Sequence, residues 1–153
     1  MPPRWFEYPF RVQPHHTDYS GVVWHGTYIT WLEAARVDCL SQMEMPFDQI
    51  FAAGFDLPVI DLSLRYHQPL RLGMAAVVKA RLAPQQKVRI QWLYEIETVG
   101  PRPQTCLTGQ VTLVVIDRQS GKIVRRLPAE IQQVIDRLLA YLAEADRVGD
   151  SLG

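Results

Sequence analysis

Four segments between Ile60 and Val115 alternate apolar and polar residues with a period of two, and only short connections separate them. This period is typical of strands that bury one face. The connections are too short to hold crossover helices, so the strands should pair largely as antiparallel neighbours. The sequence therefore predicts an antiparallel sheet with one covered face. The apolar rows are Ile60, Leu62, Leu64 and Tyr66; Ala76, Val78, Ala80 and Leu82; Val88, Ile90, Trp92, Tyr94 and Ile96; and Leu107, Gly109, Val111, Leu113 and Val115.

A helix predicted from about Gly26 to Glu44 is the segment that should cover this face. Its apolar residues occupy a wider arc than a helix on a protein surface needs, so we expect the sheet to wrap around it. Arg36 lies near this arc, where an unpaired charge would be costly, and Glu33 is placed to pair with it. The arc contains Tyr28, Ile29, Trp31, Leu32, Ala35, Cys39, Leu40 and Met43.

Three further elements flank this pattern. A first strand is predicted over Trp5–Val12, and Pro9 within it favours an edge position or a bulge because proline cannot donate to a ladder. A helical turn should run from Pro46 to about Ala53 and end at Gly54 in a left-handed cap. The closing helix follows Pro128, and its single apolar stripe contains Ile131, Val134, Ile135, Leu138 and Leu142.

The composition limits the number of domains and the class of partner. With 153 residues, 48% of them hydrophobic, the chain should form one domain over 1–153, with an ordered core at about 5–146. The formal net charge is zero, which argues against nucleic acid or an anionic membrane as the main partner. No apolar run approaches the roughly eighteen residues of a membrane span, so a cytoplasmic location is expected. Cys39 and Cys106 form no disulfide or metal pattern and are interpreted as buried, inert thiols.

The junction between Asp18 and the predicted helix is where chemistry is expected. Asp18 lies in a polar turn, Gly21 allows a sharp bend, and His25 immediately precedes the helix. A helix start leaves N–H groups unpaired and carries partial positive charge, so it can stabilise a carbonyl oxygen that gathers negative charge. A nearby carboxylate could attack that carbonyl or activate water. Two plainer readings are that Asp18 only hydrogen-bonds its turn, or that it holds a metal with His15 and His16.

The residues at this junction carry a resemblance to a known family. They are His16-Thr17-Asp18, Gly21-Val22-Val23-Trp24-His25, Tyr28, Glu33 and Arg36, followed by Tyr66-His67-Gln68-Pro69. With the predicted helix and strands, they resemble the hotdog acyl-CoA thioesterases, specifically the 4-hydroxybenzoyl-CoA thioesterase family. The resemblance implies an α+β hotdog fold, in which a five-stranded antiparallel sheet wraps around a long central helix and a C-terminal helix follows. This chain departs from the family turn at His16 and at Tyr19-Ser20, whereas Asp18 matches.

The resemblance implies an enzyme that hydrolyses an acyl-CoA thioester to the free acid and CoA. The carboxylate of Asp18 would act as nucleophile through a mixed anhydride, or as general base on water. The main-chain N–H at His25 would polarise the carbonyl, so His25 contributes its amide, its imidazole or both. Gly21, Trp24 and Tyr28 are predicted to contact substrate, and the two aromatic residues serve partly as core and partly as wall of the acyl pocket. Neither a metal nor another cofactor is expected.

Coenzyme A carries phosphates, so a neutral protein needs a local basic patch to bind it. Lys87 and Arg89 are predicted on the outward face of a strand, at about the place where relatives hold the nucleotide phosphates, and Arg65, Lys79 and Arg81 are weaker candidates. A solvated strand face is the equally weighted alternative. The family resemblance also implies a homodimer joined edge to edge, or a homotetramer, with the active site at the subunit junction.

Three competing functions fit the same pattern. The first is a thioesterase that acts on an acyl carrier protein, and the second is a hotdog dehydratase or hydratase. The third is a noncatalytic acyl-binding module, which would bind without turnover. Release of free thiol from a set of acyl-CoAs separates the enzyme from the binding module, and the same set identifies the acyl group, which the sequence does not specify.

Overall fold

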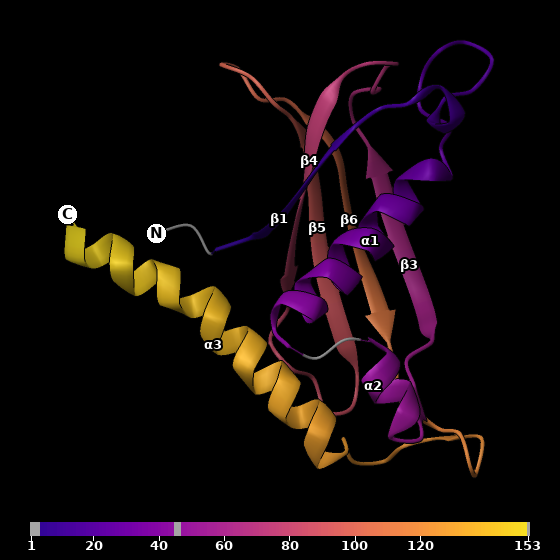
Figure 1. Cartoon of the computed structure of the whole chain (residues 1–153), viewed down its shortest axis with the longest axis vertical. Helices are drawn as coiled ribbons and strands as arrows, with labels where there is room; N and C mark the ends of the chain where they lie inside the picture. Colours follow the sequence, from indigo (N-terminus) through magenta and orange to yellow (C-terminus); the bar gives the residue numbers. More distant parts are fainter. Residues whose placement is uncertain (1–3, 45–46, 153) are drawn as a thin grey trace.

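The computed structural model of the chain describes residues 4–44 and 47–152, with the backbone alone at 47–48 and 144–152. Its main layer is a five-stranded sheet with the strand order β1-β4-β5-β6-β3, in which all neighbours are antiparallel (Figure 1). This arrangement confirms the predicted sheet. The strands are β1 (Phe6–Arg11), β3 (Val59–Tyr66), β4 (Ala75–Leu82), β5 (Ile90–Thr98) and β6 (Thr105–Leu113).

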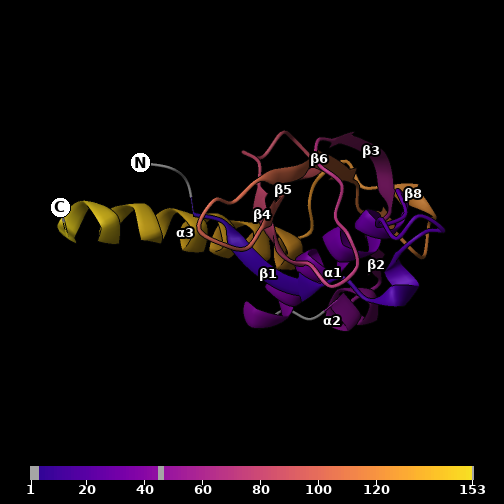
Figure 2. The same cartoon turned by 90° about the horizontal axis from the view of Figure 1, so that it is seen from above.

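A long helix, α1 (Thr27–Gln42), crosses one face of this sheet. Figure 2 shows the sheet curving around α1, which packs mainly on β1 and β4. The helix begins after Gly26, as predicted. Because apolar residues surround most of its circumference, the helix is stable only when a curved sheet covers it. Its buried apolar residues are Tyr28, Trp31, Leu32, Ala35, Cys39 and Leu40.

Two other helices close the end of the sheet that is opposite the start of α1. The short α2 (Phe47–Ala52) confirms the predicted turn, Gly54 has the expected positive φ of 98°, and Pro46 lies outside the described residues. All five stripe residues of α3 (Ala129–Leu152) are buried, so its apolar face lies on the body of the domain. The α3 backbone stays helical to Leu152, beyond the predicted limit of the ordered core, and extends past the sheet (Figure 2).

The two edges of the sheet differ in how well they are covered. Strand β1 lies at one edge, as Pro9 predicts, and its residues Phe6 and Val12 are buried. Strand β3 forms the other edge, where Ile60, Leu62 and Tyr66 are 39–48% exposed. The predicted burial of this row is therefore wrong for a single chain, because β3 pairs with β6 alone and α1 packs mainly on β1 and β4.

Local features complete the fold. A side chain at Gly109 would place its Cβ 2.9 Å from the carbonyl oxygen of Ser63, so the glycine lets the backbone of β3 approach closely. A 3₁₀ turn covers Pro14–His16. A second small sheet joins β2 (Phe55–Asp56), β7 (Ile116–Asp117) and β8 (Lys122–Ile123). These segments were not predicted because three-residue turns and two-residue strands are too short to show a period.

Candidate active site

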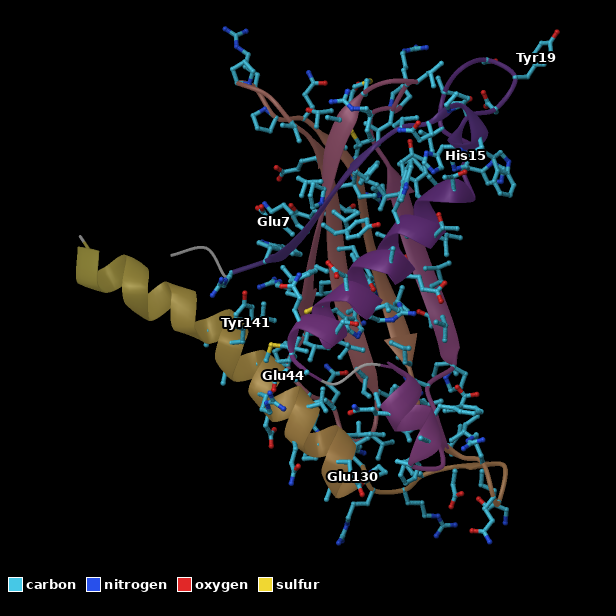
Figure 3. All side chains as sticks on the ribbon, in the orientation of Figure 1. Glu7, His15, Tyr19, Glu44, Glu130 and Tyr141 are labelled. Carbon is cyan, nitrogen blue, oxygen red and sulfur yellow. The ribbon has the colours of Figure 1, made fainter. Side chains whose placement is uncertain are left out.

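A tight loop before α1 positions Asp18. Thr17 bridges to Val23, and Gly21 turns the chain with a φ of 77°. The N–H of Asp18 donates to the carbonyl of Val22 at 2.8 Å, and its carboxylate Oδ1 accepts from the N–H of Ser20 at 2.8 Å. The Asp18 side chain is exposed, and Figure 3 shows the adjacent Tyr19 at the outer tip of the loop. The carboxylate is therefore held by its own turn and is open to solvent in one chain.

The start of α1 presents unpaired backbone amides. Among the described residues, the N–H groups of His25 and Gly26 have no hydrogen-bond acceptor. The hydroxyl of Tyr66, at the end of β3, donates to the carbonyl oxygen of His25 at 2.6 Å and so fixes the His25–Gly26 peptide plane. The positive end of the helix dipole adds to the electrostatic attraction of these amides for an oxyanion.

A cleft of about 210 Å³ lies beside this helix start. Tyr28 is 3% exposed and forms part of its wall, where the Tyr28 hydroxyl accepts from the N–H of Leu70 at 3.3 Å. Burial raises the pKa of Tyr28, so its hydroxyl stays protonated at neutral pH. The rings of Tyr28 and Tyr66 meet edge to face, with centroids 5.4 Å apart. The full lining is Val23, His25, Tyr28, Tyr66, His67, Gln68 and Pro69.

The structure brings together some of the predicted site residues and not others. His25 and Tyr28 line the cleft, whereas Asp18, Gly21 and Trp24 do not line it within one chain. Trp24 is 51% exposed and its ring lies 4.8 Å from that of His25. The cleft-lining segment from Tyr66 to Pro69 was not predicted as part of the site, although it belongs to the motif that carries the family resemblance.

The predicted phosphate-binding residues lie away from this cleft in a single chain. Lys87 and Arg89 are exposed in the turn before β5, which begins at Ile90, so their predicted place on a strand is wrong. The eight residues of β4 carry the chain from the cleft end of the sheet to this turn, a distance of roughly 26 Å at about 3.3 Å per residue. One chain therefore does not place these two cations beside His25.

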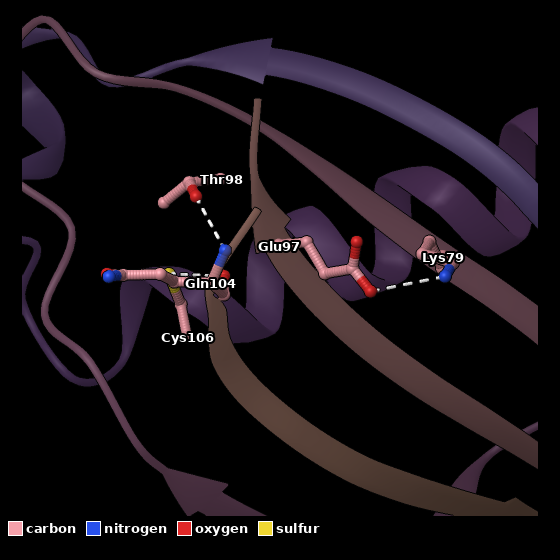
Figure 4. A network of polar contacts seen from close by, with 5 residues as sticks. All are labelled: Lys79, Glu97, Thr98, Gln104 and Cys106. Carbon is pink, nitrogen blue, oxygen red and sulfur yellow. Dashed lines mark hydrogen bonds and ion pairs between the residues drawn. The ribbon is translucent and has the colours of Figure 1, made fainter. Parts of the chain in front are cut away.

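The other basic candidates lie on the outer face of the sheet. Arg65 is exposed and borders a shallow groove over β3 and β6. Lys79 forms an ion pair with Glu97 at 3.2 Å (Figure 4), and the guanidinium of Arg81 lies 4.7 Å from the centre of the Trp5 ring. Of these three cations, Arg65 alone has a side chain that is free of such a contact among the described residues.

The predicted pairing of Glu33 with Arg36 is wrong. Arg36 is 7% exposed, and its Nη1 donates to the hydroxyl of Tyr94 at 3.2 Å, while Glu33 is exposed. The helix places residues three apart on adjacent positions, but the buried Arg36 bonds to Tyr94 under the sheet while the Glu33 side chain stays exposed.

The histidines of the loop have structural partners. The rings of His15 and His16 lie 4.1 Å apart, and Nδ1 of His16 accepts from the N–H of Gln13 at 2.9 Å. Burial and the neighbouring His15 lower the pKa of His16. Within residues 4–44 and 47–152, no three His, Cys, Asp or Glu side chains group as a metal site.

The thiols of Cys39 and Cys106 are buried, and burial raises the pKa of Cys39 to about 12, so a reactive thiolate is disfavoured.

Comparison with known proteins decides the family. A sequence profile of the thioesterase-like superfamily matches residues 12–139. The chain belongs to this superfamily. A putative esterase of Synechocystis sp. is 52% identical over 138 residues, which cover 88% of this chain and 81% of the relative. The acyl-CoA thioester hydrolase YbgC of Escherichia coli is 31% identical over 126 residues, which cover 82% and 92%. The crystal structure of a 1,4-dihydroxy-2-naphthoyl-CoA thioesterase from Synechocystis has a TM-score of 0.79 and 25% identity, covering 88% and 97%.

Membership of the thioesterase-like superfamily confirms two predictions. The fold is the hotdog fold, with the sheet wrapped around α1 and the additional helix α3 at the C-terminal end. The protein is a thioester hydrolase. No helix in the described part of the chain is long and apolar enough to cross a membrane, and the cytoplasmic location stays a prediction. The individual roles of Asp18, His25 and the basic residues also stay predictions.

Proposed function

We propose that this chain hydrolyses acyl-CoA to a free acid and CoA, with Asp18 as nucleophile or general base and the amide of His25 as oxyanion donor. The main support is the unpaired N–H of His25, which stands at the start of α1 on the wall of an aromatic cleft. A thioester carbonyl is already electrophilic and thiolate is a good leaving group. One carboxylate and a helix start can therefore suffice for the reaction.

Asp18 can bring about hydrolysis of the thioester by two routes, as general base or as nucleophile. As general base, Asp18 takes a proton from water while the water oxygen attacks the acyl carbon, the C–S bond breaks and the thiolate of CoA receives the proton. As nucleophile, Asp18 displaces CoA directly, and water then opens the mixed anhydride. Release of CoA thiol ahead of the acid in a rapid-quench time course would identify the anhydride route, and simultaneous release of both products would favour the general base.

Tyr66 is proposed to position the helix start next to the oxyanion donor, because its hydroxyl holds the carbonyl of His25 and with it the His25–Gly26 peptide plane. We expect Tyr66→Phe to lower kcat about tenfold while KM changes less than twofold, since the lost bond orients the helix start and contributes little to ground-state binding. Tyr8→Phe, a change on the opposite edge strand, is the matched control. A rise in KM with an unchanged kcat would contradict a positioning role for Tyr66.

A second copy of the chain is proposed to complete the site. Strand β3 offers an unpaired edge and an exposed apolar row next to the cleft, and such an edge readily pairs with another strand. Antiparallel pairing of β3 with its copy would extend the sheet from one subunit into the next and close a wall around Asp18. The proposed assembly is a homodimer, which can pair again into a homotetramer.

Phosphate binding by Lys87 and Arg89 depends on this dimer. Antiparallel pairing reverses the second sheet, so the turn before its β5 comes to the level of the first copy's cleft. We expect the double change Lys87→Gln and Arg89→Gln to raise KM for acyl-CoA about tenfold and to leave KM for a short thioester without the nucleotide unchanged. Lys122→Gln with Arg125→Gln is the control pair. Equal effects on both substrates would remove the phosphate role.

The assay that tests the proposed function measures thiol release from acyl-CoAs with aromatic and aliphatic acyl groups of graded length. Turnover of at least one acyl-CoA is the expected result, and the preferred acyl group reports the shape of the cleft that Tyr28 and Tyr66 line. Turnover of acyl carrier protein substrates alone would redirect the assignment to that class of thioesterase. Binding of acyl-CoA without turnover would contradict the proposed activity.

A further inference from the structure

The interior of the domain holds a charged side chain that the proposed hydrolysis does not use. Arg36 projects from the second half of α1 into a cavity of about 40 Å³. Its lining residues come from α1, α2, the start of α3 and the sheet, and Figure 1 shows these elements at the same end of the domain. Every other lining residue is hydrophobic, and Leu40, Leu82, Trp92 and Leu138 are among them. A cation therefore faces a small apolar chamber.

The hydrogen bonds of this guanidinium are incomplete. An arginine side chain carries five N–H donors and stays charged in proteins. Within the described residues, Arg36 makes one hydrogen bond, from Nη1 to the Tyr94 hydroxyl, and its buried Nε has no partner. No carboxylate of those residues lies within 4.0 Å of Arg36. Buried donors without acceptors are costly, so this arrangement calls for an acceptor that carries negative charge.

The Tyr94 hydroxyl lies beside this guanidinium, although Tyr94 is not among the residues that line the cavity. Its hydroxyl oxygen accepts from Arg36, and its own proton has no acceptor among the described side chains and backbone. Burial raises the pKa of Tyr94 to about 12, in spite of the neighbouring guanidinium, so the hydroxyl keeps its proton at neutral pH. The hydroxyl therefore holds Nη1 of the guanidinium, and Arg36 is the residue that brings N–H donors to the cavity wall.

We propose that this cavity binds a short-chain monocarboxylate of two or three carbons, such as acetate or propionate. The guanidinium fork matches the two oxygens of a carboxylate, and the hydrophobic wall at Trp92 receives the alkyl group. A dianion such as phosphate would leave one charge unpaired against apolar walls. Because a water molecule needs about 10–15 Å³ of such volume, a chamber of about 40 Å³ has room for only a few heavy atoms.

The proposed site is separate from the catalytic cleft. Arg36 lies eight residues beyond Tyr28 on α1, which places the two about 12 Å apart along the helix axis at 1.5 Å per residue. The lining residues of the two cavities do not overlap. The proposal therefore does not depend on the role of Asp18, and it can fail or succeed independently of the proposed hydrolysis.

Thermal unfolding of the full chain tests the site. Sodium propionate is compared with sodium chloride at equal ionic strength and with propionamide, which has the same shape without the charge. We expect propionate alone to raise the unfolding midpoint, because a ligand that binds the folded state stabilises it. In Arg36→Met, the dissociation constant for propionate should rise at least tenfold. Methionine keeps an apolar chain at the position, and a buried charge replaced in this way often costs little stability.

A second variant keeps the test decisive if Arg36→Met does not fold. Tyr94→Phe retains the guanidinium and removes the hydroxyl that holds its Nη1, so its dissociation constant for propionate should be several-fold higher than that of the wild type. Equal midpoints of the wild type in propionate, chloride and propionamide would overturn the proposal. The proposal would also fall if either folded variant bound propionate as tightly as the wild type, because binding would then occur elsewhere on the protein.

Discussion

Asp18→Asn is expected to lower kcat for acyl-CoA hydrolysis about a thousandfold, which is the middle of the range for loss of a catalytic acid or base. The amide can neither attack the thioester nor take a proton from water. Its Oδ1 can still accept the N–H of Ser20, which the Asp18 carboxylate accepts at 2.8 Å, so the turn is preserved. The midpoint of thermal unfolding should therefore stay close to that of the wild type, while thiol release nearly disappears.

Asp117→Asn is the matched control for this change. The carboxylate of Asp117 accepts the N–H of Gln119, two residues on, at 2.9 Å, as Asp18 accepts that of Ser20. Asp117 lies in β7, in the small second sheet. Activity in Asp117→Asn should match the wild type. Full activity in Asp18→Asn would move the chemistry to another group, with His25 the next candidate.

Much of the fold could be predicted because period and proline position are local signals. The stripe on α3 is buried at all five predicted residues, and Pro9 marks an edge strand. The apolar row of β3 shows the limit of this reasoning. A period of two identifies which face is apolar, but the same pattern arises whether the covering surface belongs to the same chain or to a second copy.

The candidate site was predictable in part for a related reason. The loop at Asp18 and the helix start at His25 are adjacent in sequence, so their chemistry could be inferred from one short segment. Tyr66 reaches His25 across 41 residues, and Arg36 reaches Tyr94 across 58 residues. Neither contact leaves a periodic signal, and Glu33 looked like the partner of Arg36 because helical spacing describes neighbours on one helix alone.

Leu62→Lys is expected to leave the chain monomeric and to lower thiol release at least a hundredfold. Leu62 is 39% exposed on the free edge of β3, so a folded monomer tolerates the lysine. A charge on an edge strand opposes pairing with another strand, and a two-fold interface would contain the lysine twice. Light scattering after size-exclusion chromatography reports the mass. The activity falls because Asp18 does not line the cleft of a single chain and needs the second copy to complete the site.

Ile123→Lys separates loss of the dimer from a general effect of surface charge. Ile123 is 53% exposed on β8, which belongs to the small second sheet and not to the β3 edge. This control should keep the mass and activity of the wild type. A monomeric wild type with full activity would contradict the shared site, because the exposed row of β3 would then have no part in catalysis. A dimeric and active Leu62→Lys protein would place the subunit contact on another surface of the domain.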